Sequence, residues 1–258
     1  MIKVKKLNLQ DKAERQKYSE KLKNFEKEFI YPLGEKSFYI SHGEQSDYFS
    51  FFEKLGTPEF LILESGNDLI GVVCLVLRSI NGKKSWYACD FKISKAYRGQ
   101  KLYRKWMWKF FVPLYLKCQR LYGINMSEPE ENKLWKHTQK IFKVFSVGIK
   151  PYYLYEFSAQ NLSDISKEIL LSHSLMTNNG VKDIIVNAKP VSIYHLVLND
   201  HIKNNLVDYK IINQKDIKAD ACVMFLISSK VNLPFAKETV VSLIHRNNES
   251  LYISSLEI

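Results

Sequence analysis

A short basic turn between a predicted strand and a predicted helix is the stretch of this chain best suited to bind an anion. The strand covers 85–94, the turn covers 95–99, and an amphipathic helix rich in Lys and Arg is expected from Gln100 to about Phe111. The first turn of a helix has free backbone N–H groups, and the helix dipole adds positive potential there. A phosphate is the usual ligand of such a strand–turn–helix unit. The alternative is a turn with a structural role alone.

Two carboxylates on predicted strands could take up a proton during group transfer. Asp90 lies on the strand that enters the basic turn, between Cys89 and Phe91, and Glu64 ends a predicted strand over 59–64. A carboxylate, or a water held by one, can remove the proton of an attacking amine. Each has a structural alternative, because a buried carboxylate usually pairs with a lysine or caps a turn. Asp90 and Glu64 are therefore candidate general bases.

Other chemistries lack their sequence motifs. The four cysteines are scattered without a Cys-x-x-Cys pair, and no His-Glu-x-x-His, Gly-x-Ser-x-Gly or Walker-type phosphate loop occurs. This pattern predicts neither a metal site nor a disulfide framework, and it favours a reducing, cytoplasmic environment. No apolar run has the length needed to cross a bilayer, and the amino terminus lacks the apolar stretch of a secretory signal.

The net charge of +11 is concentrated around the basic turn. Residues 92–150 contain 14 Lys or Arg against 3 Asp or Glu, whereas residues 161–258 contain 10 of each kind. A local positive field favours an anionic partner, which could be a phosphorylated cofactor, a nucleic acid or an acidic membrane. The alternative is a solvated basic face that keeps the protein soluble.

The change in charge balance near 159–161 divides the chain into a first part and a second part, and the second part contains no catalytic motif. Asn81-Gly82 is the strongest hairpin signal, so three antiparallel strands are expected before the basic turn. No internal repeat is detected. The elements predicted in the first part are helices over 11–29, 46–55, 100–111 and 132–145, and strands over 59–64, 69–79, 85–94, 122–126 and 150–157. Those predicted in the second part are helices over 162–175 and 234–246, and strands over 183–186, 191–198, 221–228 and 251–256.

The element order and the basic turn of residues 1–158 resemble the GNAT acetyltransferase superfamily. In that family a strand ends before an Arg/Gln-x-x-Gly-x-Gly/Ala motif, whose backbone amides bind the pyrophosphate of coenzyme A. The segment 91–100 follows this pattern, but Lys101 and Tyr103 stand where the family has its two glycines. The resemblance implies an α/β (α+β) fold with a GNAT-like mixed central sheet flanked by helices. A smaller α+β C-terminal domain of unknown role is expected over 159–258.

The resemblance also implies an acyl-CoA cofactor, most often acetyl-CoA. Strands that splay after Ile93 would let the pantetheine amides bond to the backbone of Phe91 and Ile93. Asn132, which opens the next predicted helix, would contact the pantetheine arm. Lys101 would add a cation beside the phosphates, whereas Tyr103 would crowd the packing of helix against sheet. The cofactor-binding residues implied in this way are Phe91, Ile93, Arg98, Gly99, Gln100, Lys101, Leu102, Tyr103 and Asn132.

The resemblance further suggests how the leaving thiolate is protonated. In many relatives a helix tyrosine is the donor, but the corresponding stretch over 138–145 contains no tyrosine. Tyr152, Tyr153 or Tyr103 could take this role, and Tyr152, in the strand that follows, is the candidate donor that we retain. A strand tyrosine is more often part of the core, which is the alternative for this residue.

We interpret the sequence as that of an acyl-CoA-dependent N-acyltransferase that acetylates an amine not identified by the sequence. The alternative is a catalytically inactive module of the same shape, which binds nucleic acid or an acidic partner through its basic face. A third hypothesis is a long-chain acyl donor, accommodated by a widened sheet rich in aromatic residues. The second part is expected to close over the acceptor side or to mediate a homodimer.

Overall fold

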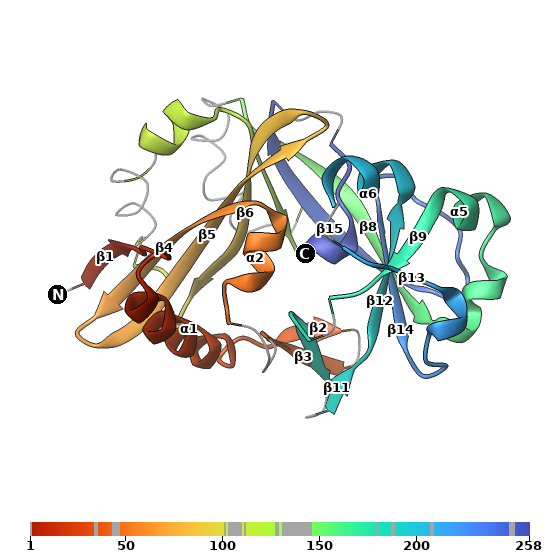
Figure 1. The fold of residues 1–258 in the computed structure, drawn as a ribbon, viewed down its shortest axis with the longest axis horizontal. Coiled ribbons are helices and arrows are strands. Elements are labelled where there is room, and N and C mark those ends of the chain that lie inside the picture. The colour runs from red at the N-terminus through yellow and green to blue at the C-terminus, as the bar shows by residue number, and fades with distance from the viewer. Residues whose placement is uncertain are drawn as a thin grey trace.

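The fold is built on a twisted sheet that contains eleven of the strands in the described part of the chain (Figure 1). The computed structural model describes residues 2–33, 36–42, 47–100, 102, 110, 112–126, 129–130, 146–178, 180–186, 189–206, 209–247 and 251–258. In spatial order the strands of this sheet are β1 (Ile2–Lys6), β4 (Thr57–Ser65), β5 (Asp68–Ile80), β6 (Lys83–Ile93), β7 (Leu121–Asn125), β15 (Lys237–Arg246), β8 (Gly148–Ser158), β14 (Cys222–Ile227), β12 (Ile193–Leu198), β9 (His173–Met176) and β13 (Ile211–Ile212).

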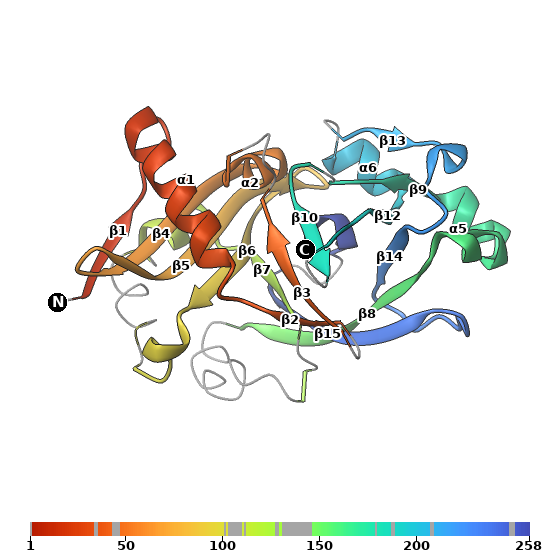
Figure 2. The ribbon, with the colours of Figure 1, turned by 90° about the horizontal axis from the view of Figure 1, so that it is seen from below.

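A second, four-stranded sheet lies beside the middle of the large one, and several short helices pack around both sheets (Figure 2). Its strands, in spatial order, are β11 (Lys189–Val191), β10 (Asp183–Val186), β3 (Lys36–Ser41) and β2 (Tyr31–Leu33). The helices that the structure describes in full are α1 (Lys12–Glu26), α2 (Ser50–Leu55), α5 (Lys167–Ser172) and α6 (Asn199–Asn205), with 3₁₀ turns η1 (Lys95–Tyr97), η2 (Ala159–Asp164), η3 (Gln214–Asp216) and η4 (Ser255–Glu257). In the part of the chain that the structure describes, no helix has the length and apolarity to span a membrane.

The helix predicted over 11–29 is confirmed as α1. Asp11 caps it, because its side chain accepts hydrogen bonds from the backbone N–H groups of the next turn. The predicted apolar stripe is buried, with Tyr18, Leu22 and Phe25 packed into the core. Contacts of α1 with β3 and β5 place this helix over one face of the large sheet.

The predicted three-stranded antiparallel meander is confirmed by the pairing of β4 with β5 and of β5 with β6. Asn81 and Gly82 both adopt positive φ, of 49° and 73°, as a two-residue hairpin turn requires. After the turn at η1 the chain returns as β7, which pairs with β6 in parallel. The order β1-β4-β5-β6-β7 is therefore the GNAT-like mixed sheet expected from the sequence, and this expectation is confirmed.

The two parts of the chain exchange their last strands. In the first part β6 and β7 are parallel, and the strand next to β7 is β15, from the second part. In the second part β12 and β14 are parallel, and the strand next to β14 is β8, from the first part. The antiparallel pair β15–β8 joins the two halves at the centre. The large sheet is thus continuous across the predicted boundary at 158/159. Each half contains a parallel pair followed by a strand from the other half, a repeat that the sequence had not revealed.

Several predictions for the second part were wrong. The segment 234–246, predicted as a helix, contains β15, because Thr239, Val240 and Val241 are β-branched and pair with β8, while the end of the strand also pairs with β7. The segment 162–175, also predicted as a helix, divides into the end of η2, α5 and the start of β9. Residues 251–256 form no strand and lead into η4. In the first part, the strands β1, β2 and β3 were not predicted from the sequence.

Candidate active site

The parallel strands β6 and β7 separate before either of them ends. Their pairing runs only from Trp86–Leu121 to Ala88–Gly123, although β6 continues to Ile93. Gly123 permits the last pair, because a Cβ atom at this position would lie 2.9 Å from the carbonyl oxygen of Ala88. The two strands therefore splay from Cys89 onward. This is five residues earlier than the position after Ile93 expected from the sequence, and that expectation is corrected.

A β-bulge in β6 sets the direction of Asp90 at the splay. Asp90 and Phe91 together face the single residue Val73 of β5, because the register shifts between Cys89 and Lys92. Asp90 has φ of 53°, in the left-handed region that residues other than glycine rarely adopt. Phe91 is left 49% exposed at the rim of the splay. The strain is thus located at the residue that the sequence marked as a candidate base.

The Asp90 carboxylate lies in a buried cluster of charged groups. Lys92 Nζ donates to Asp90 Oδ1 and to Glu26 Oε2, and Tyr48 Oη donates to Asp90 Oδ2. Burial alone would raise the pKa of Asp90, but Lys92 and Tyr48 outweigh this effect and hold it below its usual value. Burial raises the pKa of Glu26 despite its contact with Lys92. Asp90 is therefore an ion-pair partner of Lys92, the structural alternative considered for it, and a weakened base.

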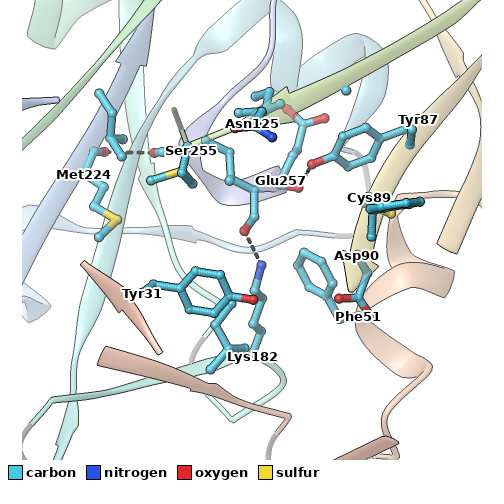
Figure 3. A pocket seen from close by; sticks show the side chains of 18 of the residues that line it. Tyr31, Phe51, Tyr87, Cys89, Asp90, Asn125, Lys182, Met224, Ser255 and Glu257 are labelled. Carbon is cyan, nitrogen blue, oxygen red and sulfur yellow. Dashed lines mark hydrogen bonds between the residues drawn. The ribbon is translucent and has the colours of Figure 1, made fainter. Parts of the chain in front are cut away.

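A cavity of about 520 Å³ opens from the splay and extends under the four-stranded sheet. At one end it is lined by Cys89, Asp90 and Phe91 of β6, and at the other by Met224 of β14 (Figure 3). The wall facing the large sheet comes from α2 and from β2, β3 and β10. Both halves of the chain thus contribute to one cavity that is continuous with the splayed strands.

Lys182 projects into this cavity between Tyr31 and Phe51 (Figure 3). Its Nζ donates to the main-chain oxygen of Ile258 and lies 4.4 Å from the centre of the Phe51 ring. Among the described residues no Asp or Glu side chain forms an ion pair with it. Burial, reinforced by the nearby ammonium of Lys92, lowers the pKa of Lys182 to about 8. Lys182 is therefore a partly buried amine that can hold or release a proton near neutral pH.

Two buried polar atoms of the cavity wall have no hydrogen-bond partner within the described part of the chain. They are Nδ1 of His42 and Oδ1 of Asn178, whose side chains are 5% and 6% exposed. Asn178 uses its other polar atom, Nδ2, to donate to the carbonyl oxygen of Leu256 over 2.7 Å. Burial lowers the pKa of His42 to about 3, so its ring is neutral. Unsatisfied buried polar atoms are costly, and these two can be satisfied by a ligand.

A second buried charge network closes the cavity near η4. Glu257 pairs with Arg78 of β5 and accepts a hydrogen bond of 2.8 Å from His201 of α6. Arg78 also donates to the hydroxyl of Tyr122 over 3.2 Å. Burial opposes the charge of Glu257, but Arg78 and His201 lower its pKa far below the usual range. The network ties β5 to the segment after β15 and fixes one wall of the cavity.

The basic turn predicted after the strand is present over 95–99, and its side chains donate hydrogen bonds to nearby main-chain oxygens. Arg98 Nε donates to the carbonyl oxygen of Ile93 over 3.0 Å, and Gln100 donates to Ala96 over 3.4 Å. Gly99 has φ of 80° and nothing near its missing side chain, so it is the residue that a left-handed turn position favours. The turn is exposed at the end of β6, beside the splay.

Other predicted site residues lie away from the cavity or outside the described residues. Leu102 is 5% exposed and packs in a core cluster with Leu61 and Val73, on the face of the sheet opposite to the cavity. Lys101, Tyr103 and Asn132 belong to segments that the structure does not describe.

Two of the three predicted catalytic residues do not line the cavity. Glu64 accepts hydrogen bonds from Tyr18 at 3.1 Å and from Lys21 at 3.2 Å. Tyr152 is buried, and its hydroxyl donates to the carbonyl oxygen of Leu251 over 2.5 Å. Only Asp90 is a cavity residue among the three.

Sequence reasoning missed Lys182, His42 and Asn178. The only local signal near them was the turn at Asn178-Asn179-Gly180, which carries no catalytic pattern. Their elements are brought to β6 by tertiary contacts alone, and a single lysine or histidine has no sequence signature.

Comparison with known proteins gives one distant relative and a group of similar folds. No protein-family model matches the chain. An uncharacterised protein of Acanthamoeba polyphaga mimivirus is 23% identical in an alignment of 213 residues that covers 76% of this chain. The chain spans about 60% of the length of that relative.

Solved structures with a similar fold are described as N-acetyltransferases or N-acyltransferases. A GCN5-related glucosamine N-acetyltransferase region of a fungal multi-domain β-N-acetylglucosaminidase matches with a TM-score of 0.46 and 9% identity, over 95% of this chain and 38% of the other. A tandem GNAT protein from the clavulanic acid biosynthesis pathway matches with a TM-score of 0.44 and 9% identity, over 95% and 98% of the two chains. A probable N-acyltransferase from Enterococcus faecalis matches with a TM-score of 0.41 and 11% identity, over 95% and 72%. The class that the strand order and the splayed pair define is the GNAT-like fold.

Proposed function

We propose that this protein is an acyl-CoA-dependent N-acyltransferase, which moves an acyl group from a coenzyme A thioester to an amine. The observation that carries the proposal is the separation of β6 from β7 after Ala88 and Gly123, directly beside the basic turn and open to a cavity. A flexible chain such as pantetheine can lie between two diverging strands. A phosphate group at its far end would then reach the turn.

The cofactor would extend from the turn into the cavity. Its phosphates are assigned to the backbone of 95–99, with Arg98 and the excess of basic residues over 92–150 as the supporting charges. Its pantetheine arm is assigned to the main chain of Phe91 and Ile93. This places the thioester close to Cys89 and Asp90, at the mouth of the cavity.

The reaction requires that the amine lose a proton and that the thiolate of coenzyme A gain one. Nitrogen attacks the thioester carbonyl carbon, the C–S bond breaks, and the proton released by the amine is equivalent to the one taken up by sulfur. Asp90 is weakened as a base by Lys92, so we assign this proton transfer to Lys182. Its pKa of about 8 lies close to the ordinary pKa of a thiol, near 8.5. Neutral Lys182 can accept a proton, and protonated Lys182 can donate one to sulfur.

The acceptor amine would be held by the two unsatisfied atoms of the cavity wall. Oδ1 of Asn178 and Nδ1 of the neutral His42 can both accept a hydrogen bond from an amine. The charge of Lys182 lowers the pKa of His42, after the larger effect of burial, and Asn178 and Lys182 line the same cavity.

Isothermal titration of coenzyme A and acetyl-CoA tests the proposal. We expect micromolar binding by the wild type and a loss of about tenfold or more in Arg98→Glu, because that change places a negative charge beside the phosphates. Lys203→Glu is the matched control, since it reverses an exposed charge on α6, in the other half, and should bind normally. No binding by the wild type near millimolar concentrations would overturn the proposal. Salt-dependent binding of nucleic acid by the same protein would then support the alternative of an inactive binding module.

A further inference from the structure

We propose that the acyl group transferred at this site is a medium- or long-chain fatty acyl group, whose tail fills the apolar part of the cavity. This inference rests on the proposed function and names its donor class. It starts from the continuity of one cavity between the splayed strands, where a thioester would lie, and the inner wall formed by β12 and β14.

The size of the cavity exceeds what an acetyl group requires. At about 30 Å³ for each carbon, the volume that one molecule occupies in liquid water, an acetyl group takes about 60 Å³. The cavity measures about 520 Å³, so an acetyl group beside the acceptor amine would leave space that a longer acyl chain can occupy.

The chemistry of the wall matches a hydrocarbon chain. Most side chains that face the cavity are aliphatic or aromatic, and the polar ones lie both at β6 and, as with His195 and Ser255, near β12 and η4. They come from the four-stranded sheet, α2 and the second half of the large sheet. The principal ones are Phe38, Ile40, Phe51, Phe52, Leu154, Ile184, Ile193 and Met224.

The four-stranded sheet forms one apolar wall of this part of the cavity. Its strands β3 and β10 pair Ile40 directly with Ile184, so the two side chains lie on the same face of the sheet and both line the cavity. On the large sheet opposite, Ile193 of β12 and Met224 of β14 are buried against it. The four-stranded sheet therefore covers the apolar part of the cavity on the side opposite to β12 and β14.

An acyl tail fits the arrangement better than an apolar acceptor. The polar atoms assigned to the amine, those of His42 and Asn178, lie on the cavity wall that also holds Lys182. The inner part has Met224 and Ile193, which suit a methylene chain, and His195 beside them is already hydrogen-bonded to Ser255 over 3.0 Å. A tail attached to a thioester at the splay would pass the amine site and enter this inner part.

The test is a titration of coenzyme A and of acetyl-, octanoyl-, dodecanoyl- and palmitoyl-CoA, without any acceptor and below their micelle-forming concentrations. Burial of one methylene contributes about 0.8 kcal/mol, which is a gain in affinity of up to about fourfold. We expect the affinity to rise with chain length until the cavity is full, by at least about 100-fold from acetyl- to octanoyl-CoA.

A filled-cavity variant sharpens this test. Ile184→Trp should weaken dodecanoyl-CoA by about tenfold or more and leave acetyl-CoA unchanged, because the larger ring occupies the space of the tail. Ile185→Trp is the matched control, since the neighbouring side chain of β10 points to the other face and does not line the cavity. Ile184→Phe is a smaller change for use if the tryptophan variant does not fold.

The outcomes separate this inference from the proposed function. Equal affinity for acetyl- and long-chain donors, with coenzyme A still bound, would overturn the chain-length inference and leave the acyltransferase proposal standing. An equal loss of both donors in Ile184→Trp would also overturn it. Failure of every thioester and of coenzyme A itself to bind would overturn both.

Discussion

The buried cluster around Lys92 gives the sharpest prediction, because one cation there compensates two carboxylates. Lys92 donates to both Asp90 and Glu26, and its own side chain is 9% exposed. Lys92→Met keeps the length and the apolar stem of the side chain but removes the charge. Two buried carboxylates would then face each other without their counter-ion.

The expected cost follows from the burial of this ion pair. Removing one partner of a buried salt bridge typically costs about 3–5 kcal/mol. For a chain of this size that loss corresponds to a fall in Tm of about 10 °C. Lys117→Met is the matched control, because Lys117 pairs with Glu59 while its own side chain is 47% exposed. Exposed pairs contribute about 0–1 kcal/mol, so the control should melt close to the wild type.

The pH dependence of the loss tests the cause. In the wild type the pKa of Asp90 is lowered, so its stabilising contribution is present above the unfolded pKa of 3.8 and is lost as the pH falls through the folded pKa. In Lys92→Met both carboxylates should have raised pKa values, so the variant gains stability as they become protonated. The difference in free energy of unfolding between the two proteins should therefore shrink from pH 7 to pH 5.

Urea unfolding followed by circular dichroism at pH 7 and pH 5 measures both quantities. A loss in Lys92→Met no larger than that of Lys117→Met would refute the reasoning. A difference that stays constant or grows on acidification would also refute it, because the cost would then come from packing rather than from uncompensated charge.

Three further predictions concern other parts of the cavity wall. Glu257→Gln should lower the free energy of unfolding by about 3 kcal/mol, because Arg78 is left buried without an anion, whereas Glu59→Gln should lower it by less than about 1 kcal/mol; urea unfolding of both checks this. The free energy of unfolding of the wild type, relative to that of Lys182→Met, should rise between pH 8 and 10.5 by at most about 3 kcal/mol. Over this range the unfolded chain binds more protons than the folded one, and a relative free energy that stays constant would contradict this. Gly99→Ala should cost about 1 kcal/mol through its φ of 80°, measured by the Tm, and a Tm equal to that of the wild type would contradict the turn geometry.

Much of the first part could be predicted because its elements depend on nearby residues. The hairpin at Asn81-Gly82 requires positive φ at two adjacent positions, and the cap at Asp11 requires only the next turn of its own helix. The candidate base Asp90 was found for a similar reason, since it lies on the strand that enters a recognisable turn. The bulge that turns Asp90 toward Lys92 had no sequence signal, because it arises from the register with β5.

The second part was predicted less well because its elements are stabilised from outside. The segment over 237–246 has apolar residues at spacings that suit either a helix or a strand, and it is a strand because β7 and β8 pair with it on both sides. Glu64 and Tyr152 were placed in the site by strand position alone. The structure shows that each has a local partner away from the cavity.

By itself, the sequence determined the meander and the turn that follows β6, because local turn chemistry and side-chain periodicity specify them; the helix predicted over 100–111 lies mostly outside the described residues. Only the tertiary structure decided the exchange of β8 and β15, the early splay of β6 from β7, and the cavity. The cavity depends on pairs such as Ile40 with Ile184 and Arg78 with Glu257. Arg78 and Glu257 are 179 positions apart in the sequence. Contacts over such separations leave no periodic signal in the chain, since either partner alone is an ordinary core or surface residue.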